Sequence, residues 1–236
     1  MMTMKAQFNL SNAEKYFKEH LRVGDYYMEG RSVTGEWYGK GAEELGLSGV
    51  TNEPEFLRLC RNLHPQTGER LTQRLNSKRV SVDGDGKVHE HANRRVFYDF
   101  TLSPPKSVSI VALVTDDRRI IEAHDNAVQA ALEELQSYAA TRVRKQGQSV
   151  FPPGDGKPGR SRLPTRHLPS IGPHLHSHCI LFNATRDTVE NRWKALEPYE
   201  MLQAKKFTEN VYYHELVRSL TRFGYQAQSK PRGFRD

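Results

Sequence analysis

The chain has 236 residues, a formal net charge of +7 and a hydrophobic fraction of 36%. This length is enough for one sizeable domain with a buried core. No apolar run approaches the ~20 residues that a membrane span needs, and the N-terminus lacks the apolar segment of a signal peptide. The two cysteines, Cys60 and Cys179, lie far apart, so a reducing cytoplasm is expected rather than a disulfide framework. The positive charge favours a polyanionic partner, with nucleic acid the commonest, over a generically basic protein.

The N-terminal third is predicted to contain four segments, which are a helix over 11–20, an aromatic segment over 24–30, a strand and turn over 35–49, and a helix over 53–63. Ser11 and Asn12 are both suitable caps for the first helix, which carries Tyr16. The helix over 53–63 has apolar residues along one side and ends before a proline.

The middle of the chain is predicted to form a hairpin, a strand and two helices. The hairpin turns at "DGDGK" over 83–87, because Asp-Gly pairs tolerate positive φ. The strand "RVFYDFTLS" follows and ends at a Pro-Pro pair, after which a helix is expected over 106–114. A longer helix is expected over 117–140, where apolar residues recur at helical spacing.

The last third begins with a segment rich in glycine and proline over 147–164, which is expected to be a loop or a hairpin tip. A histidine-rich strand and a turn come next, and two helices are expected over 198–206 and 207–223. Strands, hairpins and helices that are separated in this way favour an α+β fold over alternating βαβ units.

Three histidines at every second position, in "GPHLHSHCILFNAT" over 172–185, are the strongest chemical signal in the sequence. Alternate residues of a strand face the same way, so His174, His176 and His178 project from one face. Two imidazoles at this spacing commonly bind one divalent metal. A third ligand has to come from elsewhere, and His167, nine residues before His176, is a candidate if the two segments pair as antiparallel strands. A solvated histidine-rich strand edge is the alternative.

Two further residue types indicate catalysis. Asp99 is an acidic residue inside the apolar strand "FYDFTLS", where burial without a partner is costly. A histidine N–H is a suitable partner, and a carboxylate behind a metal-bound histidine fixes the tautomer of that ring. Tyr16, Tyr26 and Tyr27 are candidate nucleophiles, because a deprotonated tyrosine attacks phosphorus to give a phosphotyrosine. The alternative for Asp99 is a surface aspartate at a strand end, and the alternative for the tyrosines is aromatic core packing.

Several segments together resemble the relaxase domain of the MobF family of conjugative relaxases, which belong to the HUH endonucleases. The segments that carry the resemblance are, in chain order, "NAEKYF" with "GDYY", "EWYGKGAEELGLSG", "YDFTLSPPKSVS" and "HLHSHCILFNAT". They extend over about residues 12–225, which is nearly the whole chain. The resemblance implies one relaxase domain over 1–236, with a central antiparallel sheet flanked by helices, as the N-terminal fragment of a longer protein.

The resemblance also implies an activity and its residues. Members of the family nick one strand of plasmid DNA at the transfer origin, where a tyrosine becomes linked to the 5′ end and a 3′-OH is left. In this sequence the first nucleophile of the family matches Tyr16 and the second matches Tyr26. The metal ligands match His167, His176 and His178, and the aspartate that orients a ligand histidine matches Asp99. Two departures matter: Phe17 follows Tyr16 where the family often has paired tyrosines, and a shorter gap after His167 leaves His174 as a rival third ligand.

The implied cofactor is a divalent metal ion, Mg²⁺ or Mn²⁺, with Zn²⁺ or Ni²⁺ able to replace it in a crystal. The implied partners are single-stranded and hairpin DNA of the transfer origin, accessory relaxosome proteins and a coupling protein. The protein is expected to be a monomer in the bacterial cytoplasm without membrane contact. The candidate cations for the DNA backbone are Arg94, Arg95, Lys106, Arg142, Arg144, Lys145, Lys205 and Lys206.

Two other functions are compatible with the same motifs. A metal-dependent hydrolase that uses water as its nucleophile also uses H-x-H strands, but it forms no covalent adduct. An origin-binding protein that keeps the fold binds hairpin DNA without cleaving it.

Overall fold

A computed structural model of the chain describes residues 1–8, 10, 13, 15, 35–73, 78–82, 84, 88–92, 95–141, 143–145, 148–150, 165–171, 174–188 and 190–226. For residues 78–81, 88–92, 143–145, 148–150 and 166–171 it describes the backbone alone.

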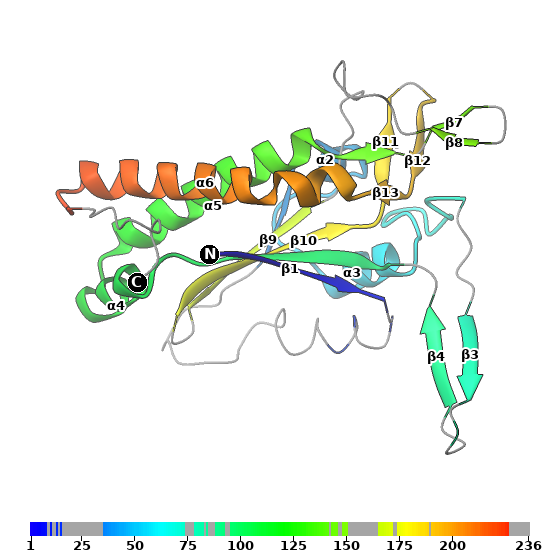
Figure 1. Cartoon of the computed structure of the whole chain (residues 1–236), viewed down its shortest axis with the longest axis horizontal. Helices are drawn as coiled ribbons and strands as arrows, with labels where there is room; N and C mark the ends of the chain where they lie inside the picture. Colours follow the sequence, from blue (N-terminus) through cyan, green and yellow to red (C-terminus); the bar gives the residue numbers. More distant parts are fainter. Residues whose placement is uncertain are drawn as a thin grey trace.

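A five-stranded antiparallel sheet forms the centre of the molecule (Figure 1). In spatial order its strands are β1 (Met2–Gln7), β5 (Phe97–Leu102), β10 (Leu175–Phe182), β9 (Thr165–Ile171) and β2 (Glu36–Tyr38). The histidine-rich segment is the central strand, β10, so it is paired on both sides. The predicted α+β fold with an antiparallel sheet is therefore confirmed.

The two faces of β10 take part in different apolar clusters. Cys179 and Leu181 belong to one cluster, together with residues of two long helices. Ile180 and Phe182 belong to a second cluster on the other side of the sheet. We call the side of Cys179 the helix face and the side of Ile180 the histidine face, because the even-numbered histidines of β10 share the latter.

Two long helices, α5 (Arg118–Ser137) and α6 (Tyr199–Arg222), cover the helix face and run alongside each other (Figure 1). The Asp117 side chain caps α5 by accepting a hydrogen bond from the Arg119 backbone N–H. The predicted apolar stripe of α5 is buried, and its inward residues are Ile120, Ala123, His124, Ala127, Val128, Ala131, Leu132 and Leu135. The shorter helix α4 (Lys106–Thr115) precedes α5, as expected from the sequence.

The prediction of two helices over 198–223 is wrong, because α6 is one continuous helix of 24 residues. Its buried residues recur every three or four positions without a break, as Met201, Ala204, Thr208, Tyr212, Leu216 and Leu220. Neither glycine nor proline occurs within these bounds, so nothing in the backbone chemistry ends the helix near the middle.

The histidine face is covered by a smaller layer. It contains α3 (Glu53–Cys60), which Asn52 caps through a 2.9 Å hydrogen bond from the Glu55 N–H. The segment over 35–49 forms β2 and then the short helix α2 (Lys40–Glu44), where the sequence predicted only a turn. Ala13, which is helical, is fully buried in the same cluster.

Within the described residues, four two-stranded ribbons complete the fold. The predicted hairpin is present as β3 (Lys78–Val82) and β4 (Val88–Ala92), and it projects away from the body of the molecule (Figure 1). The others pair β6 (Ala140–Thr141) with β13 (Leu196–Glu197), β7 (Val143–Lys145) with β8 (Gln148–Val150), and β11 (Thr185–Asp187) with β12 (Arg192–Lys194).

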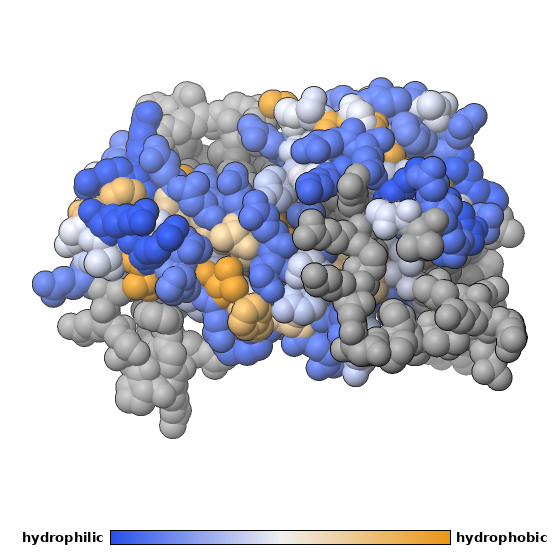
Figure 2. Space-filling model, turned by 90° about the horizontal axis from the view of Figure 1, so that it is seen from above, coloured by the Kyte–Doolittle hydropathy of each residue, from blue (hydrophilic) through white to orange (hydrophobic). Residues whose placement is uncertain are grey.

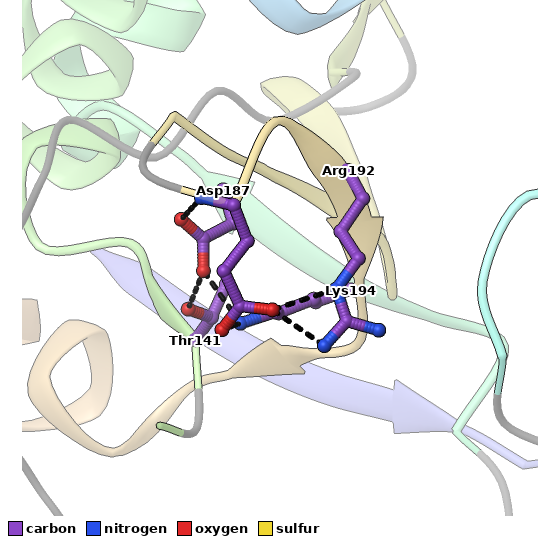
Figure 3. Close-up of polar contacts among 5 residues, drawn as sticks. Thr141, Asp187, Arg192 and Lys194 are labelled. Atoms are coloured by element: carbon purple, nitrogen blue, oxygen red, sulfur yellow. Dashed lines mark hydrogen bonds and ion pairs between the residues drawn. The ribbon is translucent and has the colours of Figure 1, made fainter. Parts of the chain in front are cut away.

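A polar cluster holds the β11–β12 hairpin closed (Figure 3). The Lys194 ammonium lies 2.6 Å from a carboxylate oxygen of Asp187 and also contacts Glu190. Asp187 accepts a further hydrogen bond from the backbone N–H of Glu190, and Thr141 donates to it from β6. Because both side chains of the Asp187–Lys194 pair are nearly buried, removing one partner would leave an uncompensated charge.

The outward side of the helical layer is mainly hydrophilic (Figure 2). The larger apolar side chains exposed on α6 are Tyr199, Leu202 and Phe207, and they are interspersed with polar residues. Single exposed apolar residues of this kind are normal for a globular protein. In the part of the chain that the structure describes, no helix is both long and apolar enough to cross a membrane.

Candidate metal centre

The H-x-H pair of the sequence lies on the histidine face of β10. The rings of His176 and His178 are half-buried, with centroids 5.1 Å apart and planes at 77°. Strand alternation brings both imidazoles to this side, while Ser177 between them points to the helix face. Two imidazoles this close on one strand suit a divalent metal that accepts nitrogen ligands.

A carboxylate from the neighbouring strand fixes the tautomer of His178. Both carboxylate oxygens of Asp99 lie close to His178 Nδ1, at 3.1 and 3.0 Å, and the Asp99 side chain is only 6% exposed. A carboxylate accepts hydrogen bonds, so Nδ1 carries the proton and the lone pair of the neutral ring is on Nε2. Thr101, directly opposite His178 in the sheet, places its hydroxyl 3.4 Å from the same nitrogen.

A backbone carbonyl does the same for His176. His176 Nδ1 lies 2.8 Å from the carbonyl oxygen of His174, which can only accept, so Nε2 again carries the lone pair. Burial is the largest influence on this ring and lowers the pKa of His176, with the nearby His178 lowering it further. In both rings Nδ1 is engaged in this way, so a metal ion would be bound through Nε2.

The third ligand of the predicted set stays a prediction. The backbone of His167 lies in β9, which does pair antiparallel with β10, but its side chain is outside the described part of the structure. In the register observed, His167 is paired with Cys179, whereas Leu168 is paired with His178. His174 is exposed just before β10. No group of three metal-ligating side chains is present among the described residues.

The candidate nucleophiles Tyr16, Tyr26 and Tyr27 lie outside the described residues. Two helical residues just before Tyr16 are described: Lys15 is exposed, and Ala13 is completely buried in the cluster on the histidine face. That cluster includes Ile180, two residues from His178 on the same face of β10. Ala13 thus lies on the same side of the sheet as the histidine pair.

The structure also brings together residues that the sequence analysis missed. His124 of α5 is fully buried and contacts both Ser177 and Tyr212 on the helix face. The signal for it was a single histidine inside the alanine- and leucine-rich stripe of α5. Lys5 of β1 is exposed and lies opposite Asp99 in the sheet, so it shares the histidine face. Only the order of the strands reveals that neighbour.

The candidate DNA-contacting cations fall into several groups. Arg94 and Arg142 lie outside the described residues, and Arg144 and Lys145 are described by their backbone alone. Lys206 is paired with Glu209 at 2.7 Å, on the outer helix α6. Arg95 is exposed, with its guanidinium 5.7 Å from the ring centroid of Phe8. Lys106 begins α4, and Lys205 lies on α6.

The central strand of this antiparallel sheet presents an H-x-H pair, and a carboxylate from the next strand lies behind one histidine. This is the arrangement expected of a relaxase domain of the HUH endonuclease class. A sequence profile described as "TrwC relaxase" matches residues 10–236. The chain belongs to the TrwC relaxase family, whose members are metal-dependent enzymes that nick and rejoin DNA through a tyrosine.

Relatives and solved structures agree with this assignment. The multifunctional conjugation protein TraI of Escherichia coli strain K12 is 31% identical over 219 residues, which is 92% of this chain and 11% of TraI. The conjugative relaxase TrwC in complex with oriT DNA, in a copper-bound structure, is 30% identical with a TM-score of 0.76, covering 99% of this chain and 74% of that one. TrwC with a 27-mer DNA comprising the recognition hairpin and the cleavage site has a TM-score of 0.73 at 28% identity, covering 98% and 72%. The chain thus spans about a tenth of the length of TraI.

Proposed function

We propose that residues 1–236 nick one strand of DNA at a transfer origin by metal-assisted transesterification, leaving a 5′-phosphotyrosine and a free 3′-OH. The observation that carries the proposal is the pair of Nε2 donors on β10 with the buried Asp99 carboxylate behind His178. Structures of TrwC include metal-bound complexes with oriT DNA, which supports the same chemistry here. The proposal concerns this segment alone and assigns none of the other activities of the longer relatives.

The donor set of the site fits a divalent metal ion. His176 and His178 would hold it through Nε2, and Asp99 would keep the His178 ring in the required tautomer and orientation. The ion supplies Lewis acidity toward a non-bridging oxygen of the scissile phosphate and offsets the charge that develops there. For the third ligand we retain both His167 and His174, and alanine variants of each decide between them by metal affinity.

The proposed nucleophile is Tyr16. Its phenolic oxygen attacks phosphorus, the bond from phosphorus to the 3′ oxygen breaks, and the leaving oxygen takes up a proton as the tyrosine proton departs. One phosphodiester bond is exchanged for another, so the step is reversible without an external energy source and the ends can be rejoined. A free tyrosine titrates near about 10, so proton removal has to accompany the attack. Tyr26 is the proposed second nucleophile for strand transfer, with Tyr27 as its rival.

Two features of the fold suit a DNA partner that includes a hairpin. The β3–β4 ribbon projects from the body of the molecule (Figure 1), and a two-stranded ribbon has the right width for the major groove of a duplex. Lys5 places a cation on the histidine face next to the site, where a single strand has to run to reach it. Accessory relaxosome proteins and a coupling protein remain proposed partners of the full-length protein.

Covalent capture tests the proposed activity. Labelled single-stranded oligonucleotides that tile the transfer origin of the encoding DNA element are incubated with the protein and Mg²⁺ or Mn²⁺, then separated on a denaturing gel. A protein–DNA adduct that disappears in Tyr16→Phe is expected. Tyr199→Phe is the matched control, because this tyrosine is exposed on the outer helix α6. Cleavage without an adduct would indicate a hydrolase, and binding without cleavage would indicate an origin-binding protein.

A further inference from the structure

A buried polar chain lies behind the histidine pair, on the opposite side of β10. Ser177, the residue between the two histidines, places its hydroxyl oxygen 2.8 Å from His124 Nε2 of helix α5. His124 Nδ1 in turn lies 2.7 Å from the hydroxyl oxygen of Tyr212 of helix α6. All three side chains are 0% exposed, so water does not compete for these hydrogen bonds.

The surroundings of the chain are mainly apolar, although Asp125 lies near enough to help burial raise the pKa of Tyr212. Tyr212 belongs to the cluster on the helix face, and the neighbours of His124 along α5 in that cluster are alanine, valine and isoleucine. Aliphatic residues of the same volume would fill this space without burying polar groups that have to find partners. Aliphatic packing has no preferred direction. The hydrogen bonds among Ser177, His124 and Tyr212 are directional, so they form only when β10 has one register against the helices.

The hydrogen bond between His124 and Ser177 holds β10 at the residue between the two proposed metal ligands. Ser177 is bonded covalently to both His176 and His178, so any slide or twist of residue 177 moves both imidazoles. Metal–nitrogen distances tolerate only about 0.2 Å, and a functional geometry has to be held within about 0.5 Å. The hydrogen bond from His124 of α5 to Ser177, which Tyr212 of α6 supports through the other nitrogen of His124, restricts that movement.

We propose that His124, supported by Tyr212, is a positioning residue that fixes the H-x-H segment of β10 through Ser177 and thereby sets the metal affinity of the site. This inference rests on the proposed metal centre on the opposite face. In this role His124 touches neither the metal ion nor the DNA. The role differs from ordinary core packing because loss of the contact changes metal binding.

Calorimetric titration with Mn²⁺ tests the proposal, at a temperature well below the unfolding transition of every variant. Ser177→Ala removes the hydroxyl, and we expect it to weaken Mn²⁺ binding about tenfold, at the lower end of the range for residues behind metal ligands. Ser177→Thr keeps the hydroxyl on a side chain suited to strands and should bind Mn²⁺ within about twofold of the wild type. Tyr212→Phe, which keeps the ring, should weaken binding by a few fold.

The control for general destabilisation is Leu135→Ala. Leu135 is fully buried on α5 but lies eleven residues, or about 16 Å along the helix, from His124. Leu135→Ala should lower the melting temperature at least as much as Ser177→Ala while leaving Mn²⁺ affinity unchanged. His124→Phe combined with Ser177→Ala should weaken Mn²⁺ binding no more than the stronger single change, since both act through one hydrogen bond.

The outcomes separate the two proposals. If the wild type binds Mn²⁺ and Ser177→Ala binds it equally well, with only the melting temperature lowered, the chain is structural and the positioning role is refuted. If Leu135→Ala weakens binding as much as Ser177→Ala, the effect reflects stability and the role is again refuted. If the wild type itself binds no Mn²⁺, or if His176→Ala leaves binding unchanged, the metal centre fails and this inference with it.

Discussion

The contact between Asp99 and His178 offers the sharpest test of the site. Changing Asp99 to asparagine keeps the size and shape of the side chain but removes its charge. In the wild type both carboxylate oxygens lie within 3.1 Å of His178 Nδ1. Asparagine has one acceptor oxygen and one amide nitrogen, so it can still accept from the Nδ1 proton but no longer increases the basicity of the ring.

The expected loss follows from this geometry. Removing a carboxylate behind a metal-bound histidine lowers metal affinity by about 10- to 100-fold, or about 1.4–2.7 kcal/mol. Asparagine preserves one hydrogen bond, so we expect Asp99→Asn near the tenfold end, whereas Asp99→Ala should approach a hundredfold. Water cannot replace the carboxylate, because Asp99 is nearly buried.

The assay pairs Mn²⁺ titration calorimetry with the rate of DNA nicking on the tiled oligonucleotides. Asp187→Asn is the matched control, since this carboxylate is also nearly buried but belongs to the β11–β12 hairpin and pairs with Lys194 (Figure 3). It should reduce stability and leave Mn²⁺ affinity intact. Unchanged Mn²⁺ affinity and nicking in Asp99→Asn, with an unaltered circular dichroism spectrum, would show that the carboxylate does not act through His178.

Three further predictions concern other residues. His176→Ala should lower Mn²⁺ affinity and nicking together, and unchanged nicking in a variant that retains Mn²⁺ in calorimetry would remove His176 from the ligand set. Lys5→Met should reduce the slope of log affinity against log salt for single-stranded DNA by about 0.7, measured by fluorescence anisotropy, while Arg222→Met at the end of α6 should leave the slope unchanged. Burial, with added repulsion from Glu36 and Glu122, raises the pKa of Asp125 to about 6. The folded state therefore holds this proton more tightly than the unfolded state, so the associated stability is complete below about pH 4 and is lost as pH rises through about 6. Asp125→Asn should consequently add about 1–2 kcal/mol in urea unfolding at pH 7.5, after allowance for partial solvent screening, and nothing at pH 4; an equal gain at both pH values would contradict this assignment.

Much of the fold was accessible to the sequence because it depends on neighbours along the chain. The period of two in the histidine segment places His176 and His178 on one face wherever the strand lies. The helical spacing of apolar residues predicts α5, and the Asp-Gly turn predicts the β3–β4 hairpin. Each of these rules acts over a few residues, so no tertiary contact is needed to apply it.

The sequence was misleading where a boundary depended on tertiary packing. The stretch over 198–223 was divided into two helices, but the inward residues of α6 continue across that division and pack on α5 and the sheet. Burial of one uninterrupted apolar stripe stabilises a long helix, and most helical stability in proteins comes from such packing rather than from local propensity.

Local rules along the chain specify the chemical groups and the face of the element that carries each of them. Which of these groups meet depends on how the elements pack. Asp99 reaches His178 across 79 positions because β5 and β10 are neighbours with Thr101 opposite His178. His124 reaches Ser177 only because α5 packs on the helix face of β10. Side-chain direction repeats with a local period, whereas strand order and register are set by the long-range packing of both faces of the sheet.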